Sequence, residues 1–182
     1  MGAIYFYYPM SGQSVDVFNC LFTGNDAVTG YGGAIMFNKV SPNVTNCTFA
    51  GNDASTGGGI YIYTDEVPVL TNCILWGNTT TSGSAQIHEA GSGVPVIQNC
   101  CIDQAEYEGI GNSIRLDPLW TAGPLGDCYL SHVGSGQLVT SPCVDTGADQ
   151  ASLFYLDLLT TRTDNVTDSG IVDMGFHHPV TD

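Results

Sequence analysis

Short runs of alternating hydrophobic and polar residues recur along the first 116 residues of the chain, with glycine, asparagine and threonine between them. Three such runs follow one another at 59–63, 67–71 and 73–76. Alternation with a period of two is typical of β-strands that bury one face. The pattern therefore predicts an all-β protein in which each repeating unit supplies three short strands.

Three columns of residues repeat in one register. Asn-Cys pairs recur at spacings of 27, 26 and 27 residues: Asn19-Cys20, Asn46-Cys47, Asn72-Cys73 and Asn99-Cys100. Isoleucines that follow small or polar residues form a second column: Ile4, Ile35, Ile60, Ile87 and Ile114. The segments 22–25, 49–52 and 75–78 form a third column and each ends in Gly-Asn. This period predicts a right-handed parallel β-helix, a β-solenoid of about five short coils with three strands per coil.

Each column has a physical role in such a stack. The isoleucines are expected to point inward, together with the residues two positions later. The four asparagines lie where the chain must turn sharply, because asparagine tolerates a left-handed backbone and its amide can bond to the same amide one coil away. The cysteines that follow are expected to form an inward stack of small apolar side chains: Cys20, Cys47, Cys73 and Cys100.

The period ends near residue 117, which predicts two regions. Residues 1–116 are expected to form the coils, and residues 117–182 are expected to form a non-repeating C-terminal cap packed on the last coil, where it would hide open strand edges. No cap is visible before the first coil. Its aromatic start is therefore a candidate edge for head-to-tail assembly of copies, or for contact with upstream coils of a longer chain: Tyr5, Phe6, Tyr7 and Tyr8.

Charge and hydropathy narrow the range of partners. Three basic residues stand against 18 acidic ones, which gives a net charge of −15 at pH 7. Such a chain is not expected to bind nucleic acid, which requires a cationic surface, but it can attract Ca²⁺. No apolar run reaches the length of a membrane span. No signal peptide opens the sequence, so a secreted form would need a leader outside it.

Several motifs resemble those of bacterial surface proteins. Gly-Gly-Ala-Ile at 32–35 and Phe-Ala-Gly-Asn at 49–52 are similar to repeats of chlamydial polymorphic outer-membrane proteins. Four motifs in order resemble bacterial right-handed parallel β-helix repeat proteins of the choice-of-anchor type: Asn-Cys to Gly-Asn at 72–78, Asp-Pro-Leu-Trp at 117–120, Ser-Pro-Cys-Val-Asp-Thr-Gly at 141–147, and Asp-Met-Gly-Phe at 173–176. The resemblance implies the fold and an extracellular or cell-surface location, and it implies no particular reaction.

The outward side of the isoleucine strands is the candidate ligand face. Side chains that alternate with the isoleucines and could contact a polysaccharide are Tyr5, Tyr7, Tyr61, Tyr63, His88 and Arg115. Aromatic rings there can stack on sugars, or they can serve only as a ladder that stabilises the sheet. A lyase would use Arg115 as its base, with His88 and Glu89 one coil away. The signatures of polygalacturonase-type hydrolases are missing from the sequence, and no catalytic residue is assigned.

Two acidic turns and a pair of histidines are candidate metal ligands. Asp26 and Asp53 occupy successive Gly-Asn-Asp turns, where stacked carboxylates would bind a cation such as Ca²⁺ or remain solvated. His177-His178 could bind zinc, but without partners at ligand spacing the pair is expected to lie in a flexible terminus.

The remaining cysteines and sequons concern covalent modification. The chain has seven cysteines, an odd number, and one disulfide is expected in an oxidising compartment among Cys101, Cys128 and Cys143. Cys101 should face away from Cys100. Candidate glycosylation sites are Asn43, Asn78 and Asn165, whereas the sequon at Asn46 belongs to the asparagine column and should be blocked.

Together these observations favour a non-catalytic extracellular or cell-surface solenoid with a structural or adhesive role, including assembly into filaments through the first coil. The alternative is a β-helix protein that binds or cleaves polysaccharide. No cofactor other than Ca²⁺ is expected.

Overall fold

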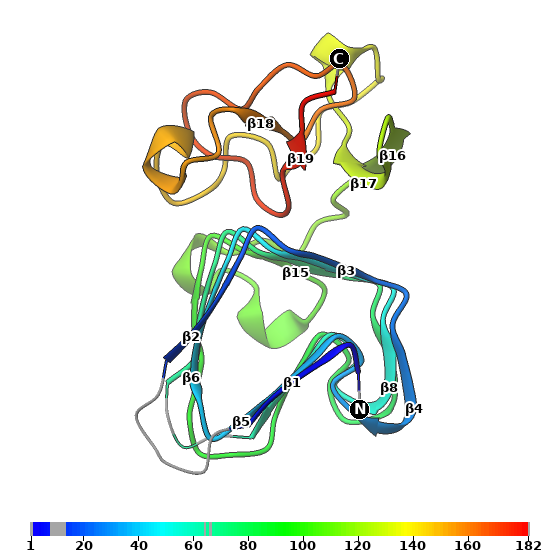
Figure 1. Ribbon diagram of the computed structural model, residues 1–182, viewed down its shortest axis with the longest axis vertical. Helices are drawn as coiled ribbons and strands as arrows, with labels where there is room; N and C mark the ends of the chain where they lie inside the picture. The colour runs from blue at the N-terminus through cyan, green and yellow to red at the C-terminus, as the bar shows by residue number, and fades with distance from the viewer. Residues whose placement is uncertain (1, 8–13, 64, 66, 182) are drawn as a thin grey trace.

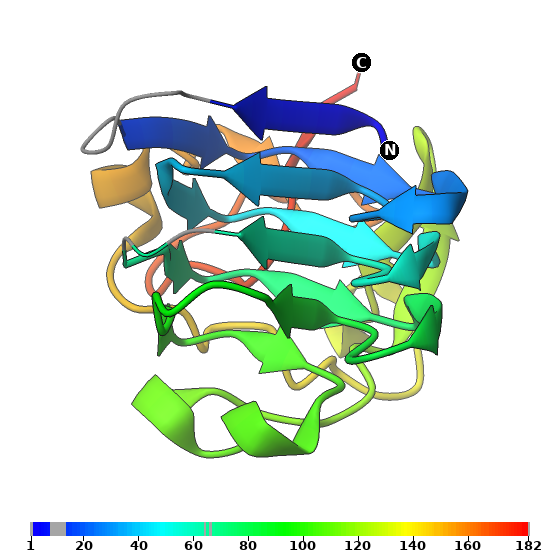
Figure 2. The same ribbon diagram turned by 90° about the horizontal axis from the view of Figure 1, so that it is seen from below.

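The computed structural model describes residues 2–7, 14–63, 65 and 67–181, and Tyr8 lies outside them. Their strands form a stack of coils with four parallel sheets along its sides (Figures 1 and 2). Sheet A contains β1 (Ile4–Tyr7), β5 (Ile35–Asn38), β9 (Ile60–Tyr63) and β13 (Ile87–Glu89). Sheet B contains β2 (Ser14–Phe18), β6 (Ser41–Thr45), β10 (Val69–Thr71) and β14 (Val96–Gln98). Sheet C contains β3 (Leu21–Thr23), β7 (Thr48–Ala50), β11 (Ile74–Trp76) and β15 (Cys101–Ile102).

Sheet D is a fourth side of the coil that the sequence pattern did not predict. It contains β4 (Asp26–Tyr31), β8 (Asp53–Thr56) and β12 (Thr79–Ser82). These segments consist mainly of small and polar residues, which read as turns when taken alone. Their strand conformation depends on hydrogen bonds to the neighbouring coil, such as that between the Asp53 amide and the Asn25 carbonyl at 2.8 Å.

The hydrophobic core lies inside the coils and follows the predicted columns. Ile4, Ile35, Ile60 and Ile87 are paired in one row of sheet A. Phe22 and Phe49 stack one coil apart in sheet C, with ring centroids 4.9 Å apart and nearly parallel planes. Each fully buried Leu, Ile or Phe side chain contributes roughly 1.5–3 kcal/mol to folding. The interior side chains of successive coils therefore stabilise the stack through contacts between identical or similar residues.

Two columns of amides satisfy the sharp turns of the coils. The asparagines between sheets B and C have a left-handed backbone, with φ of 46, 49, 54 and 47°: Asn19, Asn46, Asn72 and Asn99. Between sheets C and D a second, inward amide column runs from coil to coil, with bonds of 2.8, 2.8 and 2.6 Å: Asn25 to Asn52, Asn52 to Asn78, and Asn78 to Gln86. Buried amides of this kind are tolerated because each is hydrogen-bonded.

The last coil ends earlier than the isoleucine column predicts. Ile114 does not continue sheet A but forms a parallel bridge with Cys101, beside sheet C. The Gln104 side chain instead occupies the next position beside β13, where its amide bonds to the Ile87 nitrogen at 2.9 Å and the Ile87 carbonyl at 3.1 Å. The described residues therefore form four coils in sheet A, and the expectation of a fifth isoleucine rung is corrected.

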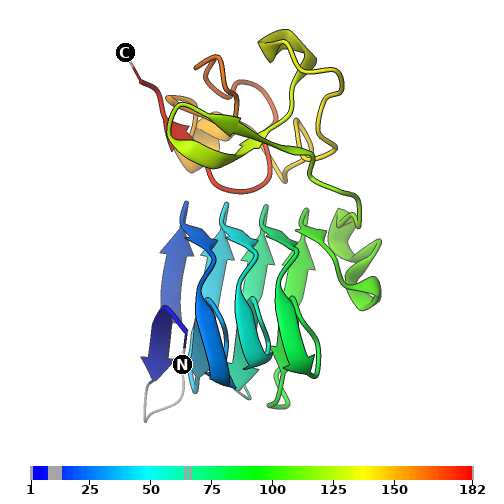
Figure 3. The same ribbon diagram turned by 90° about the vertical axis from the view of Figure 1, so that its right-hand side faces the viewer.

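Residues 103–114 close the end of the stack. This segment includes two short 3₁₀ helices, η1 (Ala105–Tyr107) and η2 (Ile110–Asn112), which lie beside the last coil (Figures 2 and 3). Tyr107 is buried in the core, and the Gly111 carbonyl accepts a hydrogen bond from the Asn99 amide at 2.7 Å. The strand edges of the last coil are thus occupied by a segment that the repeat assigned to the coils.

The C-terminal region lies along the flank of the stack, not on its end (Figure 3). Its elements are β16 (Trp120–Gly123), β17 (Gly126–Leu130), η3 (Val133–Ser135), η4 (Ala151–Phe154), β18 (Leu159–Thr160) and β19 (His178–Pro179). Hydrogen bonds join it to the asparagine column at every coil, from Asn19 with the His177 carbonyl to Asn99 with the Thr146 carbonyl, both at 3.1 Å. The expectation of a cap on the last coil is therefore corrected, because the open turn amides along the flank supply the docking groups.

None of the described helices is long and apolar enough to cross a membrane.

Candidate functional site

Sheet A carries an exposed row of aromatic side chains on its outer face. Tyr5, Tyr7 and Tyr63 are 41, 51 and 48% exposed, and Tyr31, at the end of β4, is 49% exposed. Tyr5 aligns with Met36, Tyr61 and His88 across the four strands, while Tyr7 aligns with Asn38 and Tyr63. The strands of this sheet thus place rings on β1, β9 and β13, whereas β5 presents Met36 and Asn38 in the same rows. We call Tyr5, Tyr7, Tyr31, Tyr61, Tyr63 and His88 the tyrosine face.

Contacts within the tyrosine face hold the rings in place. Tyr61 is largely buried between Tyr31 and His88, with ring centroids at 4.7 and 5.4 Å. Burial raises the pKa of the Tyr61 hydroxyl, so this group stays protonated. The Asn38 amide donates to the Tyr5 hydroxyl at 2.8 Å. Preordered rings of this kind can bind a ligand without a large loss of side-chain entropy.

Arg115 does not belong to the tyrosine face, which corrects the sequence prediction. Because Ile114 pairs with Cys101 and not with Ile87, the residue after it leaves sheet A. The Arg115 Nε donates instead to Asp103 at 3.0 Å on the surface. The postulated lyase base is therefore not placed beside His88, whose Nδ1 accepts a 3.4 Å bond from the Ser84 amide.

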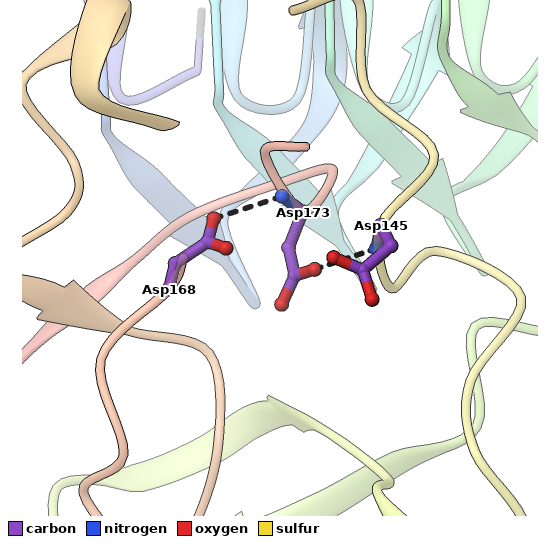
Figure 4. Close-up of side chains that lie close together, drawn as sticks. All are labelled: Asp145, Asp168 and Asp173. Carbon is purple, nitrogen blue, oxygen red and sulfur yellow. Dashed lines mark hydrogen bonds between the residues drawn. The ribbon is translucent and has the colours of Figure 1, made fainter. Parts of the chain in front are cut away.

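Three carboxylates that the sequence did not single out meet in the C-terminal region. One oxygen from each of Asp145, Asp168 and Asp173 lies within 4.8 Å of the other two (Figure 4). Asp168 and Asp173 are only 6 and 4% exposed. The Asp145 amide donates to Asp173 at 2.7 Å, and the Asp173 amide donates to Asp168 at 2.9 Å (Figure 4).

The geometry explains why two buried acidic groups are tolerated so close together. Burial, and then the negative charge of Asp168, raises the pKa of Asp173 to about 6. The Thr161 hydroxyl donates to the second oxygen of Asp173, and a ring nitrogen of His177 contacts Asp168 at 2.7 Å. Protein groups thus already hydrogen-bond both oxygens of Asp173 and one oxygen of Asp168. These bonds hold together the chain segment that docks on the asparagine column.

The position of His177 and His178 differs from the expected flexible terminus. Both are buried, and His178 stacks on Tyr129 with ring centroids 3.7 Å apart. The Asp145 and Asp173 motifs were visible in the sequence only through their resemblance to other proteins. Asp168 lies in the unremarkable run Val-Thr-Asp-Ser, and only the fold brings it to His177.

Asp26 and Asp53 lie in register on sheet D, as the repeat predicts. Asp53 accepts a hydrogen bond of 2.5 Å from the Thr79 hydroxyl of the next coil. That contact satisfies one carboxylate oxygen without a cation. Calcium binding at these turns stays a prediction.

The cysteines divide into an inner stack and a group that faces the C-terminal region. Cys73 and Cys100 are buried inside the coils, and the Cys100 sulfur accepts a 3.3 Å bond from the Cys73 amide. Cys101 points the other way and packs with Cys143, Leu130 and Met174. All seven thiols are free in this structure. A hydrogen bond with Cys101, together with burial, raises the pKa of Cys143, so these two are the neighbours among the three predicted disulfide partners.

The candidate glycosylation sites differ in exposure. Asn43 is exposed and bonds to Ser14 and Asp16. Asn165 is half-buried and its amide bonds to Thr181. Asn78 is buried in the inward amide column, which corrects its assignment as an accessible site.

Comparison with known proteins assigns the fold. No curated protein and no solved structure matches the chain. The family described as the right-handed β-helix region matches residues 3–116, which contain all four coils. The match covers more than half of the 182 residues and ends where the described coils give way to the C-terminal region. The chain belongs to the right-handed β-helix family.

Proposed function

We propose that this protein is a non-catalytic extracellular or cell-surface β-solenoid with an adhesive role, and that the tyrosine face binds polysaccharide. The observation that carries the proposal is the row of exposed rings on sheet A, three of which are between 41 and 51% exposed: Tyr5, Tyr7 and Tyr63. Exposed aromatic groups gathered on one face mark interaction surfaces.

The repeat suits a polymeric ligand. Coils lie about 4.8 Å apart, and the exposed rings of Tyr7 and Tyr63 lie two coils apart in one row, so they can contact separate sugar units of one chain. Tyrosine offers a flat apolar ring and a hydroxyl, which match the carbon–hydrogen face and the hydroxyl groups of a sugar. His88 at the end of the row adds a further polar ring.

Charge and resemblance support the rest of the proposal. A net charge of −15 disfavours strongly anionic polymers, so the ligand we propose is a neutral polysaccharide. The motif order at 72–78, 117–120, 141–147 and 173–176 resembles that of surface-displayed bacterial β-helix proteins, which supports location outside the cell.

Sedimentation with insoluble neutral polysaccharides such as cellulose and mannan tests the proposal. Each lost ring contact weakens binding about 2- to 13-fold. Tyr7→Ala combined with Tyr63→Ala should therefore raise the dissociation constant at least about fivefold, and more protein should stay in the supernatant. Tyr155→Ala is the matched control, since Tyr155 is an exposed tyrosine of the C-terminal region. Equal retention of the double variant and the control, or no retention of the wild type, would overturn the proposal.

Contact through the first coil is a second candidate role. Ile4 and Phe18 are 37 and 45% exposed there, and β1 and β2 are edge strands of the described sheets. Residues 103–114 already bond to the last strands of sheets A, B and C at the other end, which disfavours head-to-tail pairing of copies through those strands. The partner we propose is therefore an upstream coil of a longer chain or a second copy that meets the first coil with its own. Light scattering measures the oligomeric state. A monomer at all concentrations, for both the wild type and Phe18→Asp, would exclude the second copy.

A further inference from the structure

A cleft of about 520 Å³ opens between the coils and the C-terminal region. Its lining residues come from sheet C and the turns that follow it, and from the hairpin β16–β17. Figure 1 shows this hairpin across from sheet C. Its lining residues include Thr23, Gly51, Trp76, Trp120, Leu125 and Asp127. The volume lies within the range of about 300–1,000 Å³ that is usual for small-ligand sites.

The tryptophans give the cleft rigid aromatic walls. Trp76 ends β11, Trp120 begins β16, and both pack against the buried cluster that contains Ile74, Leu130 and Met174. The Trp120 indole nitrogen is shielded from solvent and has no hydrogen-bond partner among the described residues. Such a shielded, unpaired donor costs about 1–3 kcal/mol in the folded protein.

Two glycines line the cleft where the chain leaves sheet C. Gly51 and its counterpart Gly77 in the next coil have φ of 62 and 67°, which other residues adopt only with strain. Apart from the adjacent residues, no atom of the described part of the chain lies within 4 Å of the position where a Cβ would stand at either glycine. The repeat that makes the turn therefore also leaves open space against the aromatic walls.

The polar groups of the lining limit the class of ligand. Asp127 is its exposed carboxylate, and no basic residue lines the cleft. An anionic ligand would be repelled by this carboxylate and by the net charge of −15. A purely apolar ligand would remove water from the Asp127 carboxylate without replacing its hydrogen bonds. A neutral sugar fits these limits, because its hydroxyl groups donate to the carboxylate and its apolar ring face is free to stack on the indole rings.

We propose that this cleft binds a short neutral saccharide, held between Trp76 and Trp120 and oriented by Asp127. The inference rests on the proposed polysaccharide-binding function and adds a second subsite, separate from the tyrosine face and built jointly by the coils and the C-terminal hairpin.

Tryptophan fluorescence provides a direct test, because the two tryptophans of the chain both line the cleft. The full chain is titrated with cellohexaose, maltohexaose and mannohexaose, and with oligogalacturonate as the anionic counterpart. We expect a saturable change with at least one neutral oligosaccharide and a much weaker change with oligogalacturonate. No saturable change with any neutral oligosaccharide at millimolar concentration, or tighter binding of the anionic one, would overturn the proposal.

Two variants separate the subsite from the tyrosine face. Asp127→Asn removes the charged acceptor and should weaken binding roughly tenfold, whereas Asp157→Asn, at an exposed aspartate outside the cleft lining, should leave it unchanged. Trp120→Ala removes one aromatic wall and should also weaken binding. The Tyr7→Ala, Tyr63→Ala double variant should retain the full tryptophan response even where it fails to sediment with polymer. If Asp127→Asn and Trp120→Ala both bind as wild type does, the cleft is not the site.

Discussion

Replacement of Asn72 tests whether the asparagine column joins the C-terminal region to the coils. Asn72 is fully buried, and its side-chain oxygen accepts a 2.8 Å bond from the Ala148 amide. Its side-chain nitrogen donates to Asn46 at 3.2 Å. Glycine at this position accepts the backbone φ of 54° but removes both bonds, while alanine removes the bonds and adds backbone strain.

The magnitudes follow from these contacts. Loss of a buried hydrogen bond that leaves its partner unsatisfied costs about 1–3 kcal/mol, so the loss of two such bonds in Asn72→Gly should lower the free energy of unfolding by about 2–6 kcal/mol. A left-handed alanine costs about 1–2 kcal/mol more. Asn112 is the control, because it is exposed and has a φ of 62°. Asn112→Gly should therefore cost less than about 1 kcal/mol, mainly through the entropy of the unfolded chain.

Urea unfolding, followed by circular dichroism and tryptophan fluorescence, measures the free energy of unfolding of the glycine and alanine variants at positions 72 and 112. The difference between the glycine variants at 72 and 112 isolates the side-chain bonds, since the backbone requirement is the same. The difference between alanine and glycine at either position isolates the left-handed strain. If Asn72→Gly is no more destabilising than Asn112→Gly, the asparagine column does not hold the C-terminal region and the reasoning fails.

Three further predictions concern the C-terminal region and the closed end of the stack. The pKa of Asp173, about 6 in the folded protein, lies above its ordinary value of 3.8, so the folded state binds the proton more tightly. The free energy of unfolding should fall by up to about 3 kcal/mol as pH rises from 3.8 to beyond about 6. Asp173→Asn stays neutral, so its melting temperature should rise relative to that of the wild type over the same pH range. A difference in melting temperature that does not change with pH would contradict this. Gln104→Ala should speed hydrogen exchange at the Ile87 amide, which loses its 2.9 Å partner, and unchanged exchange would show that the Gln104 side chain does not close β13. Mild oxidation should link Cys101 to Cys143, and peptide mapping that finds either one joined to another cysteine would contradict the pairing.

The repeat in the sequence was sufficient to predict the coils, because each residue in a column meets its own equivalent one coil away. Ile35 pairs with Ile60 and Asn46 bonds to Asn72, at separations of 25 and 26 residues that the period states directly. The left-handed turns, the inward isoleucines and the outward tyrosines follow from the same period and from the conformational preferences of asparagine and of β-strands. Sheet D was missed since its small polar residues carry no alternation of their own.

The tertiary structure alone decided what closes and flanks the stack. Ile114 has the spacing of a fifth rung, yet it leaves sheet A because the Gln104 side chain takes the adjacent position beside β13. The bond from Asn46 to the Asp173 carbonyl spans 127 residues, and no period relates these segments. The approach of Asp168 to His177 likewise depends on how a non-repeating chain packs. Periodic contacts are encoded locally and can be read from spacing, whereas the docking of an aperiodic segment depends on which buried polar groups find partners once the whole chain has folded.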